Sequence, residues 1–210
     1  MSANCHDCQS SHALGKAPPA GYRRVLWIAL LVNALMFGVE IVGGLTSGSV
    51  SLLADAIDFF GDAANYGITL AVLGLGLAWR SRAAMLKAAS MMGFGVFVLG
   101  KAVWSMSQGV APEPITMGLI GALALAANLG VAGLLYAFRS GDANMRGVWL
   151  CTRNDAIGNV AVMLAALGVF GTGTAWPDLA VASVMAGLAI SAGWSVMRQA
   201  RQEFALDPAA

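Results

Sequence analysis

Long apolar stretches alternate with short polar segments along most of this chain. Six of these stretches are dominated by aliphatic and aromatic side chains, and they cover residues 25–45, 50–79, 85–108, 115–138, 148–170 and 179–197. Because roughly 20 apolar residues in a helix cross a bilayer core about 30 Å thick, each stretch can span a membrane. The pattern predicts an all-α polytopic membrane protein with six transmembrane helices.

The apolar stretches divide the chain into three parts. Residues 1–24 form a polar tail that we expect to be flexible and cytoplasmic. Residues 25–197 form the transmembrane domain, and residues 198–210 form a short cytoplasmic tail. Because the six predicted spans occupy nearly all of the middle part, we expect no folded soluble domain.

Composition strengthens the membrane prediction and narrows the range of partners. Hydrophobic residues make up 58% of the chain and charged residues 11%, with a mean hydropathy of +0.72. A soluble domain has about 25% charged residues, so the membrane class is strongly favoured. The net charge of +1, without a basic tract, gives no sign of a nucleic-acid partner. We expect membrane lipid around a multi-pass protein of a bacterial inner (plasma) membrane.

Basic residues are distributed unevenly between the predicted connections. One set of connections, together with the tails, holds Lys16, Arg23, Arg24, Arg80, Arg82, Lys87, Arg139, Arg146, Arg198 and Arg201. The alternate connections, residues 46–49, 109–114 and 171–178, hold none, whereas Lys101 and Arg153 are assigned to spans. By the positive-inside rule, this asymmetry predicts that the N- and C-termini are both cytoplasmic.

Two predicted spans each carry a pair of candidate metal ligands at a spacing of i, i+4. The pairs are Asp58 with Asp62 and Cys151 with Asp155. This spacing places both side chains of a pair on one helix face, one turn apart. Carboxylates inside a bilayer are costly and generally serve a function, and zinc favours four ligands with nitrogen, sulfur and oxygen donors. The pairs favour a site for a transported divalent metal.

Simpler interpretations exist for both pairs. Asp58 and Asp62 could hydrogen-bond neighbouring helices or relay protons without a metal. The repeated spacing in a second span favours the metal hypothesis for the aspartates. For Cys151 both interpretations stay open, because a free cysteine also behaves as a small buried apolar residue.

Four further polar residues flank these pairs. Asp55 either caps the start of its helix, where the helix dipole favours a carboxylate, or faces water. Glu40 in the first span is costly enough to suggest water access or a proton path. Asn159 lies one turn beyond Asp155 and is expected to orient it, while Asn154 is an alternative fourth ligand.

The N-terminal tail holds a second group of metal-binding residue types. These are Cys5, His6, Cys8 and His12. A cytoplasmic C-x-x-C pair is more typical of a metal or redox site than of a structural disulfide. The cluster predicts weak metal capture, with chance clustering in a flexible tail as the alternative.

Three segments carry a resemblance to a known family. Residues 43–56, followed by Asp58 and Asp62, resemble the second-helix signature of the cation diffusion facilitators. Residues 144–146, leading into the segment 151–159, are similar to the fifth-helix signature of that family, and the Trp-Pro-Asp of residues 176–178 resembles the start of its sixth helix. The resemblance covers nearly all of residues 25–197.

The resemblance implies a six-helix secondary transporter, rather than an enzyme, that exports a divalent metal from the cytoplasm in exchange for protons, usually as a homodimer. It implies four ligands, two from each signature, which match Asp58, Asp62, Cys151 and Asp155. The chain departs from the pattern at Cys151, where the family usually has histidine or aspartate. It also ends where the family's C-terminal cytoplasmic domain usually begins, so we expect any dimer to form through the transmembrane helices.

The donor set and its charge shape the expected substrate and mechanism. One thiolate with three carboxylates suits zinc, and also cadmium or cobalt, whereas an all-oxygen site suits manganese or magnesium better. Three carboxylates and a thiol cannot all ionise together in a low dielectric, so metal binding releases protons. Alternating access would then couple metal efflux to proton uptake, and the chain has no P-loop for nucleotide use.

Two other functions compete with transport. An intramembrane metal-dependent enzyme could use an acid pair around bound water, but the predicted spans contain no histidine and no HExxH motif. A small membrane subunit that binds a partner would account for a short chain, but it leaves the two ligand pairs unexplained.

Overall fold

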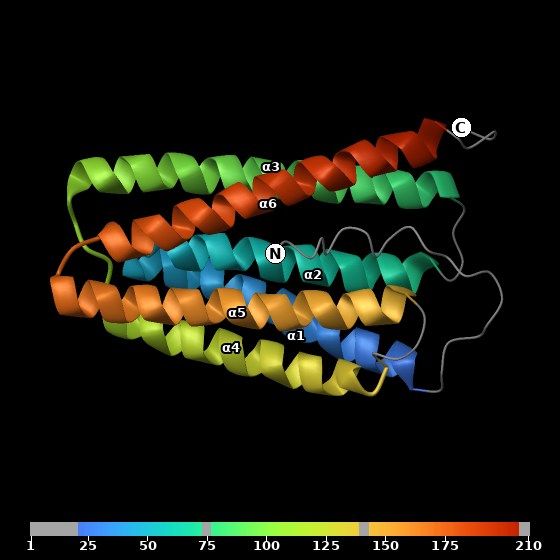
Figure 1. Cartoon of the computed structure of the whole chain (residues 1–210), viewed down its shortest axis with the longest axis horizontal. Coiled ribbons are helices and arrows are strands. Elements are labelled where there is room, and N and C mark those ends of the chain that lie inside the picture. Colours follow the sequence, from blue (N-terminus) through green and yellow to red (C-terminus); the bar gives the residue numbers. More distant parts are fainter. Residues whose placement is uncertain (1–20, 73–76, 139–142, 206–210) are drawn as a thin grey trace.

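The computed structural model describes residues 21–72, 77–138 and 143–205, and within these ranges every regular element is a helix. The helices are α1 (Tyr22–Ser47), α2 (Val50–Val72), α3 (Leu77–Gln108), α4 (Pro114–Tyr136), α5 (Ala143–Thr172) and α6 (Trp176–Ala205), shown in Figure 1. The side chains of residues 72, 77–81, 143–151, 153, 154 and 203–205 lie outside the description. The all-α prediction is confirmed for the described part of the chain.

The helix bounds differ most from the predicted spans after α2. The second span was predicted to continue to residue 79, but α2 ends at Val72 and α3 already begins at Leu77. The sequence between them is itself apolar, so hydropathy does not mark the break. At the other end of the chain, α6 continues to Ala205. The predicted span ended at residue 197 because the last turns of α6 are polar, and hydropathy detects only the apolar part of the helix.

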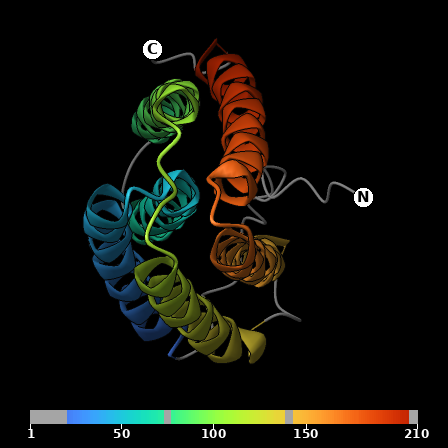
Figure 2. The ribbon, with the colours of Figure 1, turned by 90° about the vertical axis from the view of Figure 1, so that its left-hand side faces the viewer.

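The helices form a group of four and a separate pair. Seen end-on, α1, α2, α4 and α5 lie together, while α3 and α6 pack against each other on one side of the group (Figure 2). Helix α2 lies between these two parts and contacts each of the other five helices. The acidic residues of α2 are therefore sheltered from the outer surface of the molecule.

Glycines let α3 and α6 approach closely. A Cβ added to Gly95 of α3 would lie 2.6 Å from Cγ1 of Ile190 in α6. A Cβ added to Gly193 of α6 would lie 3.0 Å from the carbonyl oxygen of Ala88 in α3. Close approach through small residues is a common way for membrane helices to gain packing energy, because lipid supplies no hydrophobic drive between them.

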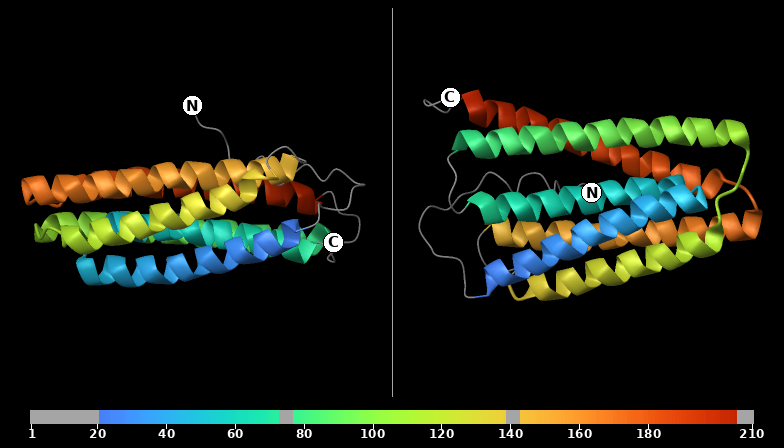
Figure 3. Two further views of the ribbon diagram at one scale, coloured as in Figure 1. Left: turned by 90° about the horizontal axis from the view of Figure 1, so that it is seen from below. Right: turned by 180° about the vertical axis from the view of Figure 1, so that it is seen from behind.

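The described ends of the chain lie at the same end of the bundle. The first residue of α1 and the last residue of α6 lie at that end, and the α1–α2, α3–α4 and α5–α6 connections lie at the opposite end (Figures 1 and 3). These three connections contain neither lysine nor arginine. At the other end, basic residues lie in the first turn of α1 (Arg23 and Arg24) and the last turns of α6 (Arg198 and Arg201).

Large apolar side chains cover the outside of the bundle. Leu35, Leu86, Leu119 and Phe170 are 69%, 71%, 68% and 73% exposed. Five helices are long and apolar enough to cross a membrane, and α2, with its three aspartates, is the exception. An apolar exterior around a polar interior is the arrangement that lipid favours. The prediction of an integral membrane protein with several spanning helices is confirmed.

Candidate functional site

The start of α2 is fixed by an acid from α6, and this sets the depth of the aspartates on α2. Asp178 accepts hydrogen bonds from the backbone N–H groups of Val50 (2.8 Å) and Ser51 (3.0 Å) and from Oγ of Ser49 (2.7 Å). Oγ of Ser49 in turn accepts from the N–H of Leu52 at 3.2 Å. These contacts satisfy N–H groups that the first turn of a helix leaves without partners.

This cap overturns one interpretation of Asp55. The sequence offered Asp55 as a candidate cap, but it lies in the second turn of α2, whose first-turn N–H groups already bond Asp178 and Ser49. It does not face water either, because its side chain is only 1% exposed. Sequence reasoning did not identify Asp178 as the cap. It noted both the serine-containing segment before α2 and the Trp-Pro-Asp segment that begins α6, but it did not connect them.

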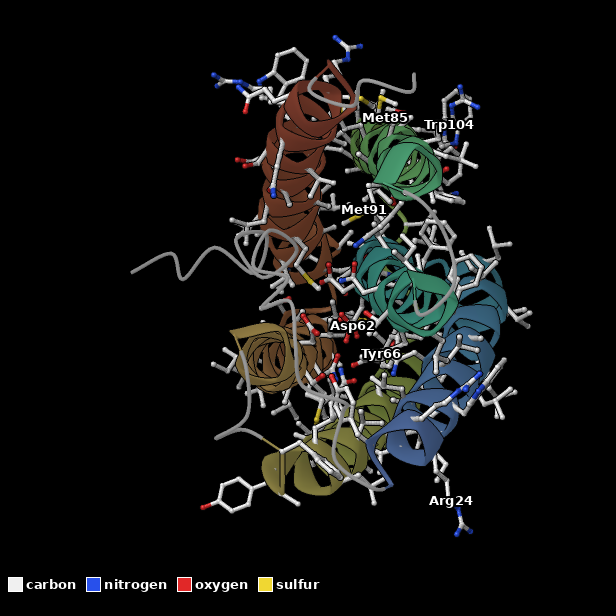
Figure 4. All side chains as sticks on the ribbon, turned by 90° about the vertical axis from the view of Figure 1, so that its right-hand side faces the viewer. Arg24, Asp62, Tyr66, Met85, Met91 and Trp104 are labelled. Atoms are coloured by element: carbon white, nitrogen blue, oxygen red, sulfur yellow. The ribbon has the colours of Figure 1, made fainter. Side chains whose placement is uncertain are left out.

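Helix α2 carries a line of acids along its buried face. Asp55 and Asp62 are 1% and 7% exposed, and Asp58 between them is half-buried. Tyr66 follows one turn after Asp62 and is 1% exposed. Figure 4 shows Asp62 and Tyr66 inside the bundle rather than on its rim. The periodicity of the helix thus produces a polar strip in the most sheltered part of the molecule.

Asp62 and Asp155 come together where α2 faces α5. Their side chains interact across the two helices. Oη of Tyr66 donates to Oδ2 of Asp62 at 2.9 Å and lies 2.7 Å from Oγ1 of Thr152 on α5. Because the tyrosine proton goes to the carboxylate, the threonine hydroxyl is left to donate to Tyr66. We refer to these four residues as the Asp62–Asp155 cluster.

A lysine from α3 borders this cluster. Lys87 is only 5% exposed, and its Nζ donates a hydrogen bond to Oδ1 of Asn65, which follows Asp62 by one turn of α2. The charge of Lys87 also acts on the carboxylate of Asp62. The sequence analysis counted Lys87 among the basic residues of a connection, and this was wrong. A flanking position was inferred from charge alone, but Lys87 lies within α3 and is buried, where the amide oxygen of Asn65 accepts its hydrogen bond and the charge of Asp62 lies nearby.

A second pair of acids lies between α1 and α2. Glu40 has no exposed surface, and it interacts with Asp55, while the charge of Asp58 also acts on it. Neither oxygen of Glu40 nor Oδ2 of Asp55 has a hydrogen-bond donor among the described residues. We refer to these two residues as the Glu40–Asp55 pair. The water access expected for Glu40 is not present in this conformation.

Helix α5 also approaches the Glu40–Asp55 pair. A Cβ added to Gly158 would lie 3.8 Å from Oδ1 of Asp55. The next residue, Asn159, is fully buried, and neither polar atom of its amide has a hydrogen-bond partner in the described structure. Asn159 therefore makes no hydrogen bond to Asp155, and the expected orienting contact is not formed here.

Several predicted site residues fall outside the described structure. Cys151 and Asn154 lie on α5, but their side chains are not described; the predicted N-terminal ligands Cys5, His6, Cys8 and His12 also lie outside the described residues. Among the side chains that are described, no three residues of the types His, Cys, Asp and Glu form a group that could hold a metal. The four-ligand set thus stays a prediction, of which the structure brings Asp62 and Asp155 together.

Comparison with known proteins gives a consistent result. Residues 26–205 match the family model described as the cation efflux transmembrane domain. The chain is 26% identical to the metal cation efflux system protein CzcD of Cupriavidus metallidurans, over 86% of this chain and 61% of that protein. It is 26% identical to the zinc transporter ZitB of Escherichia coli, over 96% of this chain and 67% of that protein.

A third relative is named for several metals. The chain is 25% identical to the cadmium, cobalt and zinc/H(+)-K(+) antiporter of Bacillus velezensis, over 84% of this chain and 61% of the relative. The chain thus spans about three fifths of the length of the first curated relatives it matches. Because each match covers most of this chain, the likeness concerns the helical bundle as a whole.

Proposed function

Because this chain belongs to the cation efflux family, we propose that it moves a divalent metal, with zinc as the main substrate, out of the cytoplasm in exchange for protons. The observation that carries the proposal is the meeting of Asp62 and Asp155 across two helices in the sheltered interior. The relatives' names, which include zinc, cadmium and cobalt, support this range of substrates. Cadmium and cobalt are the proposed secondary substrates.

The proposed ligands are Asp58, Asp62, Cys151 and Asp155. Asp58 stands one turn before Asp62 on α2, and Cys151 stands one turn before Asp155 on α5. Asp62 interacts with Asp155, and Asp58 and Cys151 would add one oxygen and one sulfur donor to give a four-coordinate set, which zinc accepts. Tyr66 would hold Asp62 in orientation, as outer partners of metal ligands commonly do.

Proton exchange follows from the charge of this site. Two carboxylates within hydrogen-bonding reach repel each other when both are ionised, so the empty site is most stable with a proton between them. A dication replaces that proton because its two charges compensate both carboxylates. We further propose that the Glu40–Asp55 pair lies on the proton path. A buried acid is costly to ionise, so each acid of the pair would pass its proton to the neighbouring acid or to water that enters the site.

The proposal also includes a topology and an assembly. We infer six spans, because α2 is sheltered by the other helices and its acids need not contact lipid. We propose that the end of the bundle with the basic outer turns of α1 and α6 faces the cytoplasm, in line with the positive-inside rule. We propose a homodimer formed through the transmembrane helices, since apolar side chains cover the described exterior.

Transport by proteoliposomes tests the proposal directly. Wild-type protein with a trapped zinc indicator and a trapped pH indicator should show zinc movement accompanied by opposite proton movement. Asp62→Asn should abolish both fluxes, because it removes a ligand charge from the centre of the site. Glu113→Gln is a matched control, since Glu113 is an exposed acid that caps α4 far along the chain from the site.

The same assay separates the competing functions. A membrane subunit that only binds a partner would give no metal flux with zinc, cadmium or cobalt. An intramembrane enzyme would also give none. Zinc flux unchanged in Asp62→Asn would retain transport but exclude the proposed site.

A further inference from the structure

Among the described side chains, a buried cation lies beside the proposed metal site, and it comes from a different helix than the ligands. Lys87 of α3 is 5% exposed, and its ammonium group donates to Asn65 on α2. Its positive charge acts on Asp62. A buried charge is strongly unfavourable unless opposite charge or hydrogen-bonding groups compensate it. The acidic cluster on α2 and α5 is therefore what allows a lysine at this depth.

Two polar side chains of α2 interact with Lys87. Asn65 offers a neutral amide oxygen, and Asp62, one turn earlier on the same helix, offers a carboxylate. A lysine side chain has a flexible four-carbon stem and a compact charge, so its ammonium group can shift between neighbouring acceptors without movement of the backbone. The amide oxygen of Asn65 is a neutral acceptor that holds the ammonium near the site but away from the carboxylate of Asp62.

A divalent metal at the site would compete with this ammonium group. Both are cations, and both gain from the carboxylate of Asp62, so each weakens the binding of the other. When the metal is absent, the ammonium compensates part of the negative charge. When the metal is present, the ammonium is repelled, and the amide oxygen of Asn65 is the acceptor that can still receive it.

We propose that Lys87, held beside the site by Asn65, is a tethered counter-cation whose charge competes with the substrate for Asp62. This inference rests on the proposed function, because it assigns a role at the same site. In this role Lys87 keeps metal affinity low enough for release, which a transporter needs as much as it needs binding. Lys87 is a positioning and affinity-setting residue and not a ligand.

The proposal predicts opposite effects for two substitutions. Lys87→Met keeps the length of the side chain and removes its charge, so zinc should bind at least about tenfold more tightly. Asn65→Ala removes the neutral acceptor that holds the ammonium, so the ammonium should move toward the carboxylate of Asp62 and zinc should bind more weakly. In the variant that combines Lys87→Met with Asn65→Ala, the loss of the neutral acceptor should have no effect, and zinc affinity should match that of Lys87→Met alone.

Two controls separate charge from packing. Lys87→Arg keeps the charge and should keep affinity near that of the wild type. Lys101→Met removes a lysine from the same helix, several turns away, and should leave affinity unchanged. A merely structural lysine would give weaker binding when it is replaced by methionine, which is the opposite of the expected direction.

Isothermal titration of the purified full chain in detergent with zinc, cadmium and cobalt measures these affinities. Tighter zinc binding in Lys87→Met together with weaker binding in Asn65→Ala is the expected result. Equal or weaker binding in Lys87→Met, with wild-type binding intact, would overturn the counter-cation while the proposed transport site stands. If neither the wild type nor Lys87→Met binds any of the three metals, both proposals fail. Should Lys87→Met not fold, unchanged or tighter zinc binding in Asn65→Ala would refute the inference.

Discussion

The two groups of buried acids on α2 differ in what surrounds them. In the Asp62–Asp155 cluster, the carboxylate of Asp62 accepts a hydrogen bond from Tyr66 and lies near the charge of Lys87. In the Glu40–Asp55 pair, three of the four carboxylate oxygens have no donor among the described residues. Asp62 is almost completely buried, as are Glu40 and Asp55, whereas Asp155 is half-buried. Burial alone therefore does not distinguish a candidate cation site from a candidate proton site.

The difference lies in the donors that each group receives. The hydroxyl donor of Tyr66 and the nearby charge of Lys87 both stabilise an ionised carboxylate at Asp62. The Asp62–Asp155 cluster is therefore suited to offer negative charge to a metal. Acids without donors avoid ionisation in a low dielectric and share a proton instead. This difference is consistent with the proposal that one group binds the metal and the other transfers protons, each with one acid on α2.

The first prediction concerns the cap of α2, whose loss should displace the acids of both groups together. Asp178→Ala removes the acceptor for two backbone N–H groups and one hydroxyl at the start of α2. Loss of these charge-assisted hydrogen bonds should lower the free energy of unfolding by about 3 kcal/mol, measured by thermal or denaturant unfolding in detergent. Asp178→Asn retains one acceptor oxygen and should lose less. Equal stability of wild type and Asp178→Ala would show that the cap does not anchor α2.

The second prediction separates the functions of the two groups. Glu40→Gln removes a proton carrier but no proposed ligand, so zinc affinity should change by less than about threefold while proton-coupled zinc flux falls at least about tenfold. Titration calorimetry and proteoliposome flux measure the two quantities on the same preparation. The control is Glu113→Gln, which should leave both unchanged. A parallel loss of affinity and flux in Glu40→Gln would assign Glu40 to the metal site.

The third prediction concerns the donor that distinguishes the Asp62–Asp155 cluster. Tyr66→Phe removes the hydroxyl that orients Asp62 and leaves the ring in place. Zinc affinity should weaken by about tenfold, which is the lower end of the range for outer partners of metal ligands. Tyr136→Phe, at an exposed tyrosine of α4, is the matched control. Unchanged affinity in Tyr66→Phe would mean that another contact fixes Asp62.

A fourth prediction tests the ligand whose side chain lies outside the described structure. Cys151→Ser replaces a thiolate by a neutral hydroxyl and should lower cadmium affinity several-fold more than manganese affinity, because cadmium prefers sulfur. The ratio of the two affinities, measured by competition with a fluorescent chelator, is the readout. A ratio equal to that of the wild type would indicate that Cys151 is a packing residue.

Much of the architecture could be predicted from local patterns. Apolar runs of sufficient length indicate helices in a bilayer, and the spacing of Asp58 and Asp62 places both on one helix face whatever packs around them. The family resemblance of the α2 and α5 segments was likewise readable, because it depends on residues adjacent in the sequence, and the family match confirms it. The break after Val72 was missed because the sequence there is as apolar as the helices.

The partners of the buried polar residues depended on the tertiary structure. Asp178 caps a helix that begins more than a hundred residues earlier, and Lys87 reaches α2 from the adjacent helix pair. Glu40 meets Asp55 only because α1 packs beside α2 in this register. The sequence determined which residues are costly to bury, since that cost is a property of each side chain. Which of them compensate one another was decided by helix packing, since linear spacing carries no information on contacts between separate helices.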